Sequence, residues 1–220
     1  MEFRTKIKNN VRYEYPQRKK RTSWGFYAFI LLFLCAILFL RWYWTNNFGG
    51  VTVSGHSMDK TLYNGEQLLM QYTDGSDAER GDIIVVYVGD YKEFSETNEA
   101  NKTEYLIKRL IAIEGDSVRC TDGKIEIKYA GTVEWTPLDE PYAYYQDMLA
   151  YDFNEYVVGA GEVFFLGDNR NNSQDSRYME VGGSRLNALY KQSDIVGIVP
   201  DWAVKHQKIL GKVFFRNVKK

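Results

Sequence analysis

Ser57 stands in a short polar segment, Ser54-Gly55-His56-Ser57-Met58, directly after a brief apolar stretch. A serine near a glycine at a strand end can expose both its hydroxyl and its backbone N–H, as a nucleophile and an oxyanion-hole donor require. Ser57 is therefore a candidate nucleophile, presented by a loop that includes Gly55 and Met58. Gly-x-Ser is also common in ordinary polar turns, and the local pattern alone favours that simpler interpretation.

Lys108 interrupts an apolar run at residues 105–113. On a β-strand it shares one face with Leu106 and Leu110, whereas Arg109 lies on the other face. Two adjacent cations thus point in opposite directions, and one of them can point inward. Burial lowers the pKa of a lysine toward the range of a general base. The alternative is that both cations reach solvent from an edge strand, and the local pattern alone favours it.

A third polar segment, residues 167–177, follows the apolar run at 163–166 and contains no aliphatic side chain. Such a segment cannot build a core, but it can form a dense hydrogen-bonded loop held rigid by Asp–Arg pairs. Its two aspartates and two arginines alternate with serine and asparagine, which indicates residues that orient others. The alternative is an ordinary solvated loop.

With only two histidines and two cysteines, the chain has few residues for a metal site or for disulfides. His56 and His206 lie 150 positions apart, which argues against a zinc catalytic site. Cys35 and Cys120 are too few for a disulfide scaffold or a cysteine-rich metal site. We therefore expect no metal and no other cofactor. His56 adjoins Ser57 and would point to the opposite strand face, so it is only an alternative base, and His206 is expected to be structural.

The elements that position these residues begin with a membrane signal. Residues 24–40 carry no charge, and as a helix they would span ~25 Å, close to the ~30 Å hydrocarbon thickness. A net charge of +6 over residues 1–21 precedes them, and Trp42-Tyr43-Trp44 follows. This pattern indicates an uncleaved anchor with a cytoplasmic N-terminus. A buried helix and a cleavable signal peptide are the alternatives, but no pair of small residues follows before Gly49.

Charge and length predict the domain organisation. We expect a basic cytoplasmic segment at 1–21, a transmembrane anchor at 22–45 and an extracytoplasmic domain at 46–220. Because the whole chain has a net charge of −1, residues 22–220 sum to −7, which argues against a nucleic-acid-binding domain.

The outer domain is predicted to be mainly β, because short apolar runs alternate with turn residues. Asp122-Gly123 is the strongest hairpin signal. Besides the anchor, only residues 180–191 favour a helix. Residues 91–102 are predicted to be a loop, and residues 132–158 an excursion from the core without an assigned function. The predicted strands are 51–54, 67–73, 82–88, 104–114, 117–121, 124–130, 162–166 and 194–199.

Together and in this order, these segments resemble the type I signal peptidases (leader peptidases), which are membrane-anchored serine proteases with a Ser–Lys dyad. Gly55, two positions before Ser57, is the residue that the Gram-positive branch of this family has at that position. The resemblance covers roughly residues 20–200, with insertions near 91–102 and 132–160. The motifs that carry it are Gly55-His-Ser57-Met58 with Thr61-Leu62, Arg80-Gly81-Asp82 with the apolar run to Val86, Lys108-Arg109 with Gly115-Asp116, and Gly167-Asp-Asn-Arg-x-x-Ser-x-Asp-Ser-Arg177.

The resemblance implies a role for each matching residue. Ser57 attacks the scissile carbonyl, and its backbone N–H is one oxyanion-hole donor. Lys108 takes the serine proton and returns it to the leaving amine. Ser173 matches the family serine whose hydroxyl orients the lysine. The residues that hold this region in place are Asp168, Asp175 and Arg177.

Four positions depart from the family pattern. Gly55 stands where some members have the hydroxyl that supplies the second oxyanion donor, which leaves that donor open. Lys60 and Glu114 replace prolines, and Ala112 replaces a glycine. Lysine neither fixes φ nor stiffens a turn as proline does, so a looser nucleophile loop is expected.

The resemblance implies removal of signal peptides from secreted preproteins at the membrane lipid surface. The substrate would be an extended peptide with small residues at the first and third positions before the cut. One alternative is a peptidase dedicated to a pilus-type or secreted cargo. Others are a non-catalytic membrane-anchored assembly factor and a Ser–Lys self-cleaving regulator. The sequence assigns no oligomeric state.

Overall fold

The computed structural model describes residues 3–8, 11–16, 24–89, 105–145, 152–178, 180–181, 184–185 and 190–207. The chain forms two compact units, Met1–Trp44 and Thr45–Lys220. The first unit holds an antiparallel hairpin, β1 (Phe3–Lys8) and β2 (Val11–Pro16), and most of helix α1 (Trp24–Asn47). The loop predicted at 91–102 lies outside the described residues.

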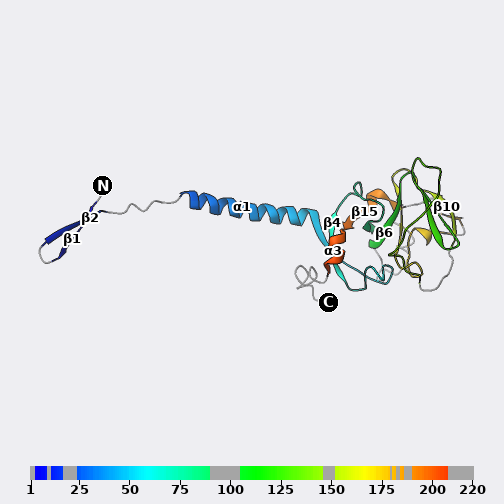
Figure 1. The fold of residues 1–220 in the computed structure, drawn as a ribbon, viewed down its shortest axis with the longest axis horizontal. Coiled ribbons are helices and arrows are strands. Elements are labelled where there is room, and N and C mark those ends of the chain that lie inside the picture. The colour runs from blue at the N-terminus through cyan, green and yellow to red at the C-terminus, as the bar shows by residue number, and fades with distance from the viewer. Residues whose placement is uncertain are drawn as a thin grey trace. The chain divides into compact units, whose positions relative to one another are not determined.

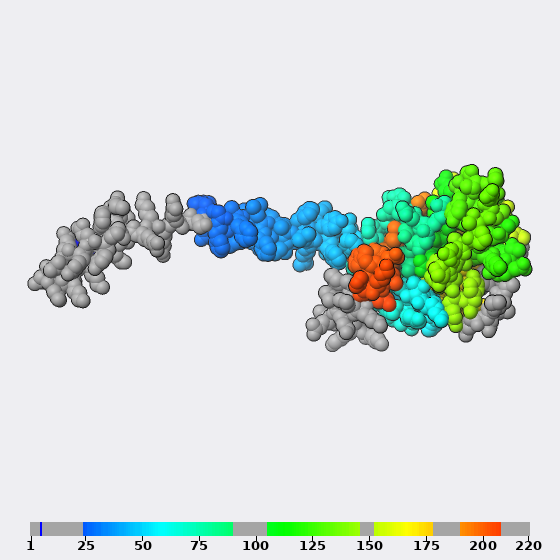
Figure 2. Space-filling model, viewed as in Figure 1, coloured from blue at the N-terminus to red at the C-terminus, as the bar shows by residue number. Residues whose placement is uncertain are grey.

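Helix α1 confirms the helix predicted from the apolar run and continues to Asn47. It has no buried residue, and it is drawn in blue in the space-filling view of Figure 2. A helix that is apolar on all sides and buries none of its residues is suited to lipid. By length and composition, α1 can cross a membrane once.

The described part of the second unit contains two larger antiparallel sheets and one two-stranded pair, and it confirms the predicted mainly β fold (Figure 1). The larger sheet has seven strands in the order β14-β11-β6-β5-β15-β4-β3, and the smaller has four in the order β10-β7-β8-β9. The strands of the larger sheet are β3 (Phe48–Thr52), β4 (Gln67–Tyr72), β5 (Ile83–Tyr87), β6 (Tyr105–Ile113), β11 (Glu162–Leu166), β14 (Tyr190–Lys191) and β15 (Ile195–Val199). Those of the smaller sheet are β7 (Ser117–Thr121), β8 (Lys124–Lys128), β9 (Thr136–Pro137) and β10 (Phe153–Val157). The remaining elements are the pair β12 (Glu180–Val181) and β13 (Ser184–Arg185), the 3₁₀ turns Ser176–Tyr178 and Gln192–Asp194, and helix α3 (Asp201–Lys205).

The predicted strands agree with the observed ones to within three residues at either end. The Asp122-Gly123 hairpin joins β7 to β8, and both residues have positive φ (51° and 72°), as a type I′ turn requires. The helix predicted at 180–191 is wrong, because its described residues form β12, β13 and β14. Val181 pairs with Ser184 across two glycines, a hairpin composition that outweighs the weak helical periodicity.

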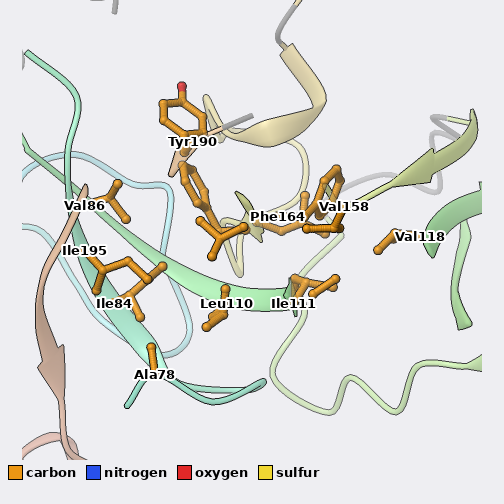
Figure 3. Close-up of a cluster of buried hydrophobic side chains, with 14 of the residues drawn as sticks. Ala78, Ile84, Val86, Leu110, Ile111, Val118, Val158, Phe164, Tyr190 and Ile195 are labelled. Carbon is orange, nitrogen blue, oxygen red and sulfur yellow. The ribbon is translucent and has the colours of Figure 1, made fainter. Parts of the chain in front are cut away.

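Strand β6 lies at the centre of the core. Buried apolar side chains from both sheets form one cluster, and Figure 3 shows Leu110 and Ile111, neighbours on β6, extending it in different directions. Ile84 lies near Leu110, whereas Val118 lies beyond Ile111. Since β6 contributes to the core from both faces, a polar side chain on this strand is buried unless it lies near the strand's end.

Asp116 ties the end of β6 to two other parts of the unit. Its buried carboxylate accepts two hydrogen bonds from Arg80, at 2.6 and 2.7 Å. It also accepts the backbone N–H groups of Ile113 and Ala130, at 3.1 and 2.9 Å. These donors outweigh the opposing effect of burial and hold the pKa of Asp116 below 3.8. The turn after β6 is therefore fixed by one charged group.

We predict that Asp116→Asn lowers the free energy of unfolding by about 2–3 kcal/mol at pH 7, because the Arg80 guanidinium loses its charged partner. Since folding lowers the pKa of Asp116, its contribution is present above pH ~3.9 and is lost as the pH falls through the lowered value. Urea unfolding of the full chain in detergent at several pH values measures both effects. Asp122→Asn, an exposed control that keeps a residue suited to positive φ, should leave stability unchanged. Equal stabilities for wild type and Asp116→Asn at pH 7 would contradict this role.

Candidate active site

The structure brings Ser57 and Lys108 together, although 51 positions separate them in the sequence. Lys108 Nζ lies 2.7 Å from Ser57 Oγ and also donates to the carbonyl oxygen of Ile107 at 3.1 Å. The lysine is 2% exposed and Arg109 is 8% exposed. Neither cation reaches solvent, so both sides of β6 bury one charged residue.

The register of the larger sheet explains how Lys108 reaches the serine. Lys108 pairs with Ile84 on β5, but on the other side of β6 the pairing with β11 ends at Arg109 and Leu166. Residues 167–177 leave β11 at this point and form the polar loop predicted from sequence, which we call the catalytic loop. Its backbone meets the segment around Ser57, because Asn169 N donates to Ser57 O at 2.9 Å.

Burial lowers the pKa of Lys108 from 10.5 to about 8. The carboxylates of Asp175 and Asp168 oppose this effect, and Arg177 adds to it. Among the described residues, no carboxylate lies within 4.0 Å of the ammonium. The lysine is therefore neutral in a substantial fraction of molecules near pH 8, as a general base must be.

Ser57 is held in a series of tight turns at residues 56–62, which we call the nucleophile turn. Asp59 N donates to His56 O at 3.2 Å, and Thr61 N donates to Met58 O at 3.0 Å. Met58 and Leu62 anchor the turns in the interior, with 1% and 0% exposure. The backbone N–H of Ser57 has no partner among the described residues, so it is available to an oxyanion.

Asp168 connects the catalytic loop to both β6 and the nucleophile turn. Its carboxylate accepts two hydrogen bonds from Arg109, at 2.8 and 2.6 Å, and one from Thr61 Oγ1 at 2.5 Å. The next residue, Asn169, donates through its side-chain nitrogen to His56 O at 2.9 Å. The chain segments that carry Ser57 and Lys108 are thus linked through adjacent loop residues.

Asp175 and Arg177 form a second pair within the loop. Arg177 donates twice to the Asp175 carboxylate, at 2.7 and 2.8 Å, and Gly167 N donates to it at 3.0 Å. Ser173 is 7% exposed, and its hydroxyl has no hydrogen-bond partner in the described part of the chain. It packs against Gly167, where a Cβ would lie 2.5 Å from Ser173 Cβ.

Comparison with known protein families gives a match over most of the chain. A family model described as signal peptidase, peptidase S26, matches residues 23–216. The chain belongs to the signal peptidase family. The resemblance predicted from sequence is thereby confirmed, and the chain is a member of a family of serine peptidases.

Relatives of this family member cover most of its length. Signal peptidase I P of Bacillus subtilis subsp. natto is 31% identical over 84% of this chain and 91% of that protein. Signal peptidase IB of Staphylococcus aureus (strain N315) is 28% identical over 86% of this chain and 83% of that protein. A solved signal peptidase I of Enterococcus faecalis V583 aligns with 24% identity and a TM-score of 0.39, over 57% of this chain and 98% of that chain.

A groove of about 340 Å³ opens beside the Ser57–Lys108 pair. One wall is the segment 51–58 and the other is residues 105–108 of β6, with Asn172 and Gln174 of the catalytic loop at its margin. On the β11 side, residues 105–108 have no strand partner in the described ranges. The groove thus places a free strand edge next to the candidate nucleophile.

The two histidines make other contacts. The exposed His56 ring lies 3.2 Å from the Asp59 carboxylate. The ring of His206 contacts the carbonyl oxygen of Trp202 at 2.8 Å, at the end of α3. Among the described residues, no group of histidine, cysteine and acidic side chains is arranged to hold a metal ion.

Sequence reasoning missed a contact between residues 140–145 and the catalytic loop. Arg170, 1% exposed, donates to both carboxylate oxygens of Glu140 and, at 3.1 Å, to the Tyr145 hydroxyl. The Arg109 guanidinium lies 3.9 Å from the ring centroid of Tyr142. Three tyrosines and one glutamate within six residues were a compositional signal, but their partners lie 25 to 33 positions away in sequence. We call residues 140–145 the strap.

The positions that depart from the family pattern also have partners in this structure. Glu114 accepts a hydrogen bond from Gly161 N at 2.8 Å. Lys60 has φ of 84°, a conformation closed to proline, whose φ is fixed near −65°. The nucleophile turn of this chain therefore differs in backbone path from one that holds proline at position 60.

We predict that Gly167→Ala lowers kcat/KM by at least about tenfold, because its methyl group would lie 2.5 Å from the Ser57 carbonyl oxygen and would displace the nucleophile. The measurement is cleavage of a preprotein by the full chain in detergent. Gly25→Ala in α1 is the matched control, since a Cβ there meets nothing within 4 Å. Full activity of a folded Gly167→Ala variant would show that this close approach does not position Ser57.

Proposed function

We propose that the protein is a membrane-bound serine endopeptidase that removes N-terminal signal peptides from secreted preproteins with a Ser57–Lys108 dyad. The observation that carries this proposal is the 2.7 Å contact between Ser57 Oγ and the buried Lys108 Nζ. Membership of the signal peptidase family supports the same chemistry. The lysine is buried apart from its contact with the groove, and its lowered pKa suits proton transfer.

The chemistry follows from the arrangement of the two side chains. Neutral Lys108 accepts the Ser57 hydroxyl proton while the serine oxygen attacks the scissile carbonyl carbon. The Ser57 N–H donates to the resulting oxyanion. The Lys108 ammonium then gives the proton to the leaving amine, and the C–N bond breaks to leave an acyl-enzyme. Neutral Lys108 next takes a proton from a water, which attacks the ester carbon. The ester C–O bond breaks, and the Lys108 ammonium returns the proton to Ser57 Oγ, which restores the free enzyme.

The free edge of β6 supports an extended peptide as substrate. A peptide strand lying in the groove would pair with residues 105–108 and direct alternate side chains toward the groove walls. Small residues at the first and third positions before the cut, as the resemblance implies, would bring the scissile carbonyl close to Ser57. Helix α1 would hold the enzyme in the membrane, with the basic N-terminus in the cytoplasm and residues 46–220 outside.

The assembly-factor alternative is disfavoured by one feature. Burying a lysine away from carboxylates is unfavourable, and a protein that only binds signal peptides has no need of it. A peptidase dedicated to one cargo uses the same dyad, and it differs only in the substrates that the groove accepts.

We predict that the purified full chain, in detergent or lipid, cleaves a preprotein with an Ala-x-Ala site after the second alanine. Ser57→Ala and Lys108→Ala should each lose cleavage, as mass spectrometry of the products would show. The value of kcat/KM should rise with pH through a midpoint near 8, because only neutral Lys108 can accept the proton. His56→Ala is the matched control and should keep both cleavage and this midpoint.

Two results would contradict the proposed dyad. Cleavage that survives Lys108→Ala but fails in Ser57→Ala and His56→Ala would assign the base to His56. If the folded wild type does not cleave, a dedicated cargo or the assembly-factor function becomes the better explanation. Capture of a native partner by Ser57→Ala, followed by incubation of that partner with wild type, separates those two.

We further predict that Lys108→Met is inactive yet more stable than wild type by about 2–3 kcal/mol at pH 7. Folding lowers the pKa of Lys108 from 10.5 to about 8, so the unfavourable burial of its charge is fully present below pH 8. The advantage of the variant should shrink as the pH rises from 8 to 10.5. Urea unfolding measures it, with the exposed Lys124→Met as a control that should not change stability. A less stable Lys108→Met at pH 7 would contradict the claim that burial of this charge is unfavourable.

A further inference from the structure

We propose that Lys60 and Tyr144 are positioning residues, whose contact holds the nucleophile turn against the strap and thereby fixes Ser57. The Lys60 ammonium lies 4.6 Å from the centroid of the Tyr144 ring, within the range of a cation–π interaction. Lys60 is three residues after the nucleophile and Tyr144 belongs to the strap. This inference rests on the proposed function, because it concerns the rate at which Ser57 acts.

The backbone of Tyr144 is joined to the residues that hold Ser57. Tyr144 N donates to Asp168 O at 2.7 Å, and Arg170 N donates to Tyr144 O at 2.9 Å. These two bonds flank Asn169, whose backbone donates to Ser57 O and whose side chain donates to His56 O, both at 2.9 Å. A displacement of Tyr144 would therefore be passed through Asn169 to the nucleophile.

The strap is a firm support for the Tyr144 ring. The Glu140–Arg170 ion pair is almost fully buried, with side-chain exposures of 9% and 0%. Arg170 also donates through Nε to Gly167 O at 3.1 Å, which ties the strap to the start of the catalytic loop. On the other side, Tyr142 stacks on Arg109, the residue that binds Asp168. The ring is thus presented by a segment that contacts Arg170 through Glu140 and Arg109 through Tyr142.

Lys60 needs such a contact because its backbone is in a costly conformation. A φ of 84° is in the left-handed region, which non-glycine residues adopt only when their surroundings hold them there. Thr61 N closes the turn onto Met58 O at 3.0 Å, and Thr61 Oγ1 binds Asp168. Besides these two hydrogen bonds, the Lys60 side chain provides a third contact, which joins the outer side of the turn to Tyr144. This contact limits the motion of the nucleophile turn, as the proline of the family pattern would do at this position.

The experiment compares four variants of the full chain on the Ala-x-Ala preprotein. Lys60→Met keeps the side-chain length without charge, and Tyr144→Leu removes the ring. Each should lower kcat about two- to five-fold with KM unchanged within twofold, because the contact acts on the position of Ser57 and not on substrate binding. Lys60→Arg and Tyr144→Phe, which preserve cation and ring, should retain the wild-type kcat. The pH midpoint near 8 should not move, since Lys108 is untouched.

A double-mutant cycle and a distant control separate positioning from general stability. Lys60→Met combined with Tyr144→Leu should lower kcat no further than either single change, because both remove one contact. Lys128→Met removes an ammonium that lies 4.9 Å from the Trp135 ring centroid in the smaller sheet, and it should leave kcat unchanged. Thermal unfolding in detergent checks that each variant is folded.

The outcomes distinguish this inference from the proposed function. If wild type cleaves and Ser57→Ala does not, the dyad stands, and unchanged kcat in both Lys60→Met and Tyr144→Leu would overturn the positioning role alone. Losses that multiply in the double variant would also overturn it, since the two residues would then act independently. Failure of wild type to cleave would instead overturn the proposed function on which the inference depends.

Discussion

The rest of this structure depends on one constraint, which is a lysine buried beside a serine without a contact to any carboxylate of the described residues. Asp168 and Asp175 lie close enough to raise the pKa of Lys108. Each of them is bound twice by its own arginine, Arg109 and Arg177. The pairing limits the negative potential that reaches the lysine, so burial remains the dominant effect. The ion pairs of the loop therefore help to keep Lys108 able to lose its proton, besides holding the loop in shape.

The same constraint explains why the dyad lies where two strands stop pairing. Lys108 is one residue beyond the last β6–β11 pair, so it still lies within the sheet while the catalytic loop can cross its end. One residue farther into the paired region, at position 109, the side chain lies on the other face of β6, where Arg109 binds Asp168. Nearer the start of β6, a lysine would be as exposed as Tyr105, which is 51% exposed. Its pKa would then return toward 10.5. Few positions along one strand can be both buried and in contact with a groove.

Much of the fold could be predicted from sequence, because strands and turns leave local signals. The two members of the candidate dyad, Ser57 and Lys108, followed instead from the family resemblance of several motifs in order, since the local pattern at each favoured a simpler interpretation. Strand alternation predicted that Lys108 and Arg109 point in opposite directions, and polar composition marked the catalytic loop. Alternation could not show that both cations are buried, since the partner of Arg109 lies 59 positions away. The strap was missed for the same reason: its tyrosines and Glu140 acquire meaning only from Arg109, Arg170 and Lys60. The helix at 180–191 failed because a short hairpin carries little periodicity.

At two positions where the family pattern has proline, this chain restricts its backbone through a contact with a distant residue. A proline restricts its own backbone, whereas Lys60 depends on an aromatic ring 84 positions away, and Glu114 depends on a backbone N–H of residue 161. In each case a local covalent restriction is replaced by a tertiary contact. Such contacts are only as rigid as their supports, so the buried Glu140–Arg170 pair acquires a role that the dyad alone would not require. In this chain the order of the nucleophile turn is therefore a property of the strap and the catalytic loop together.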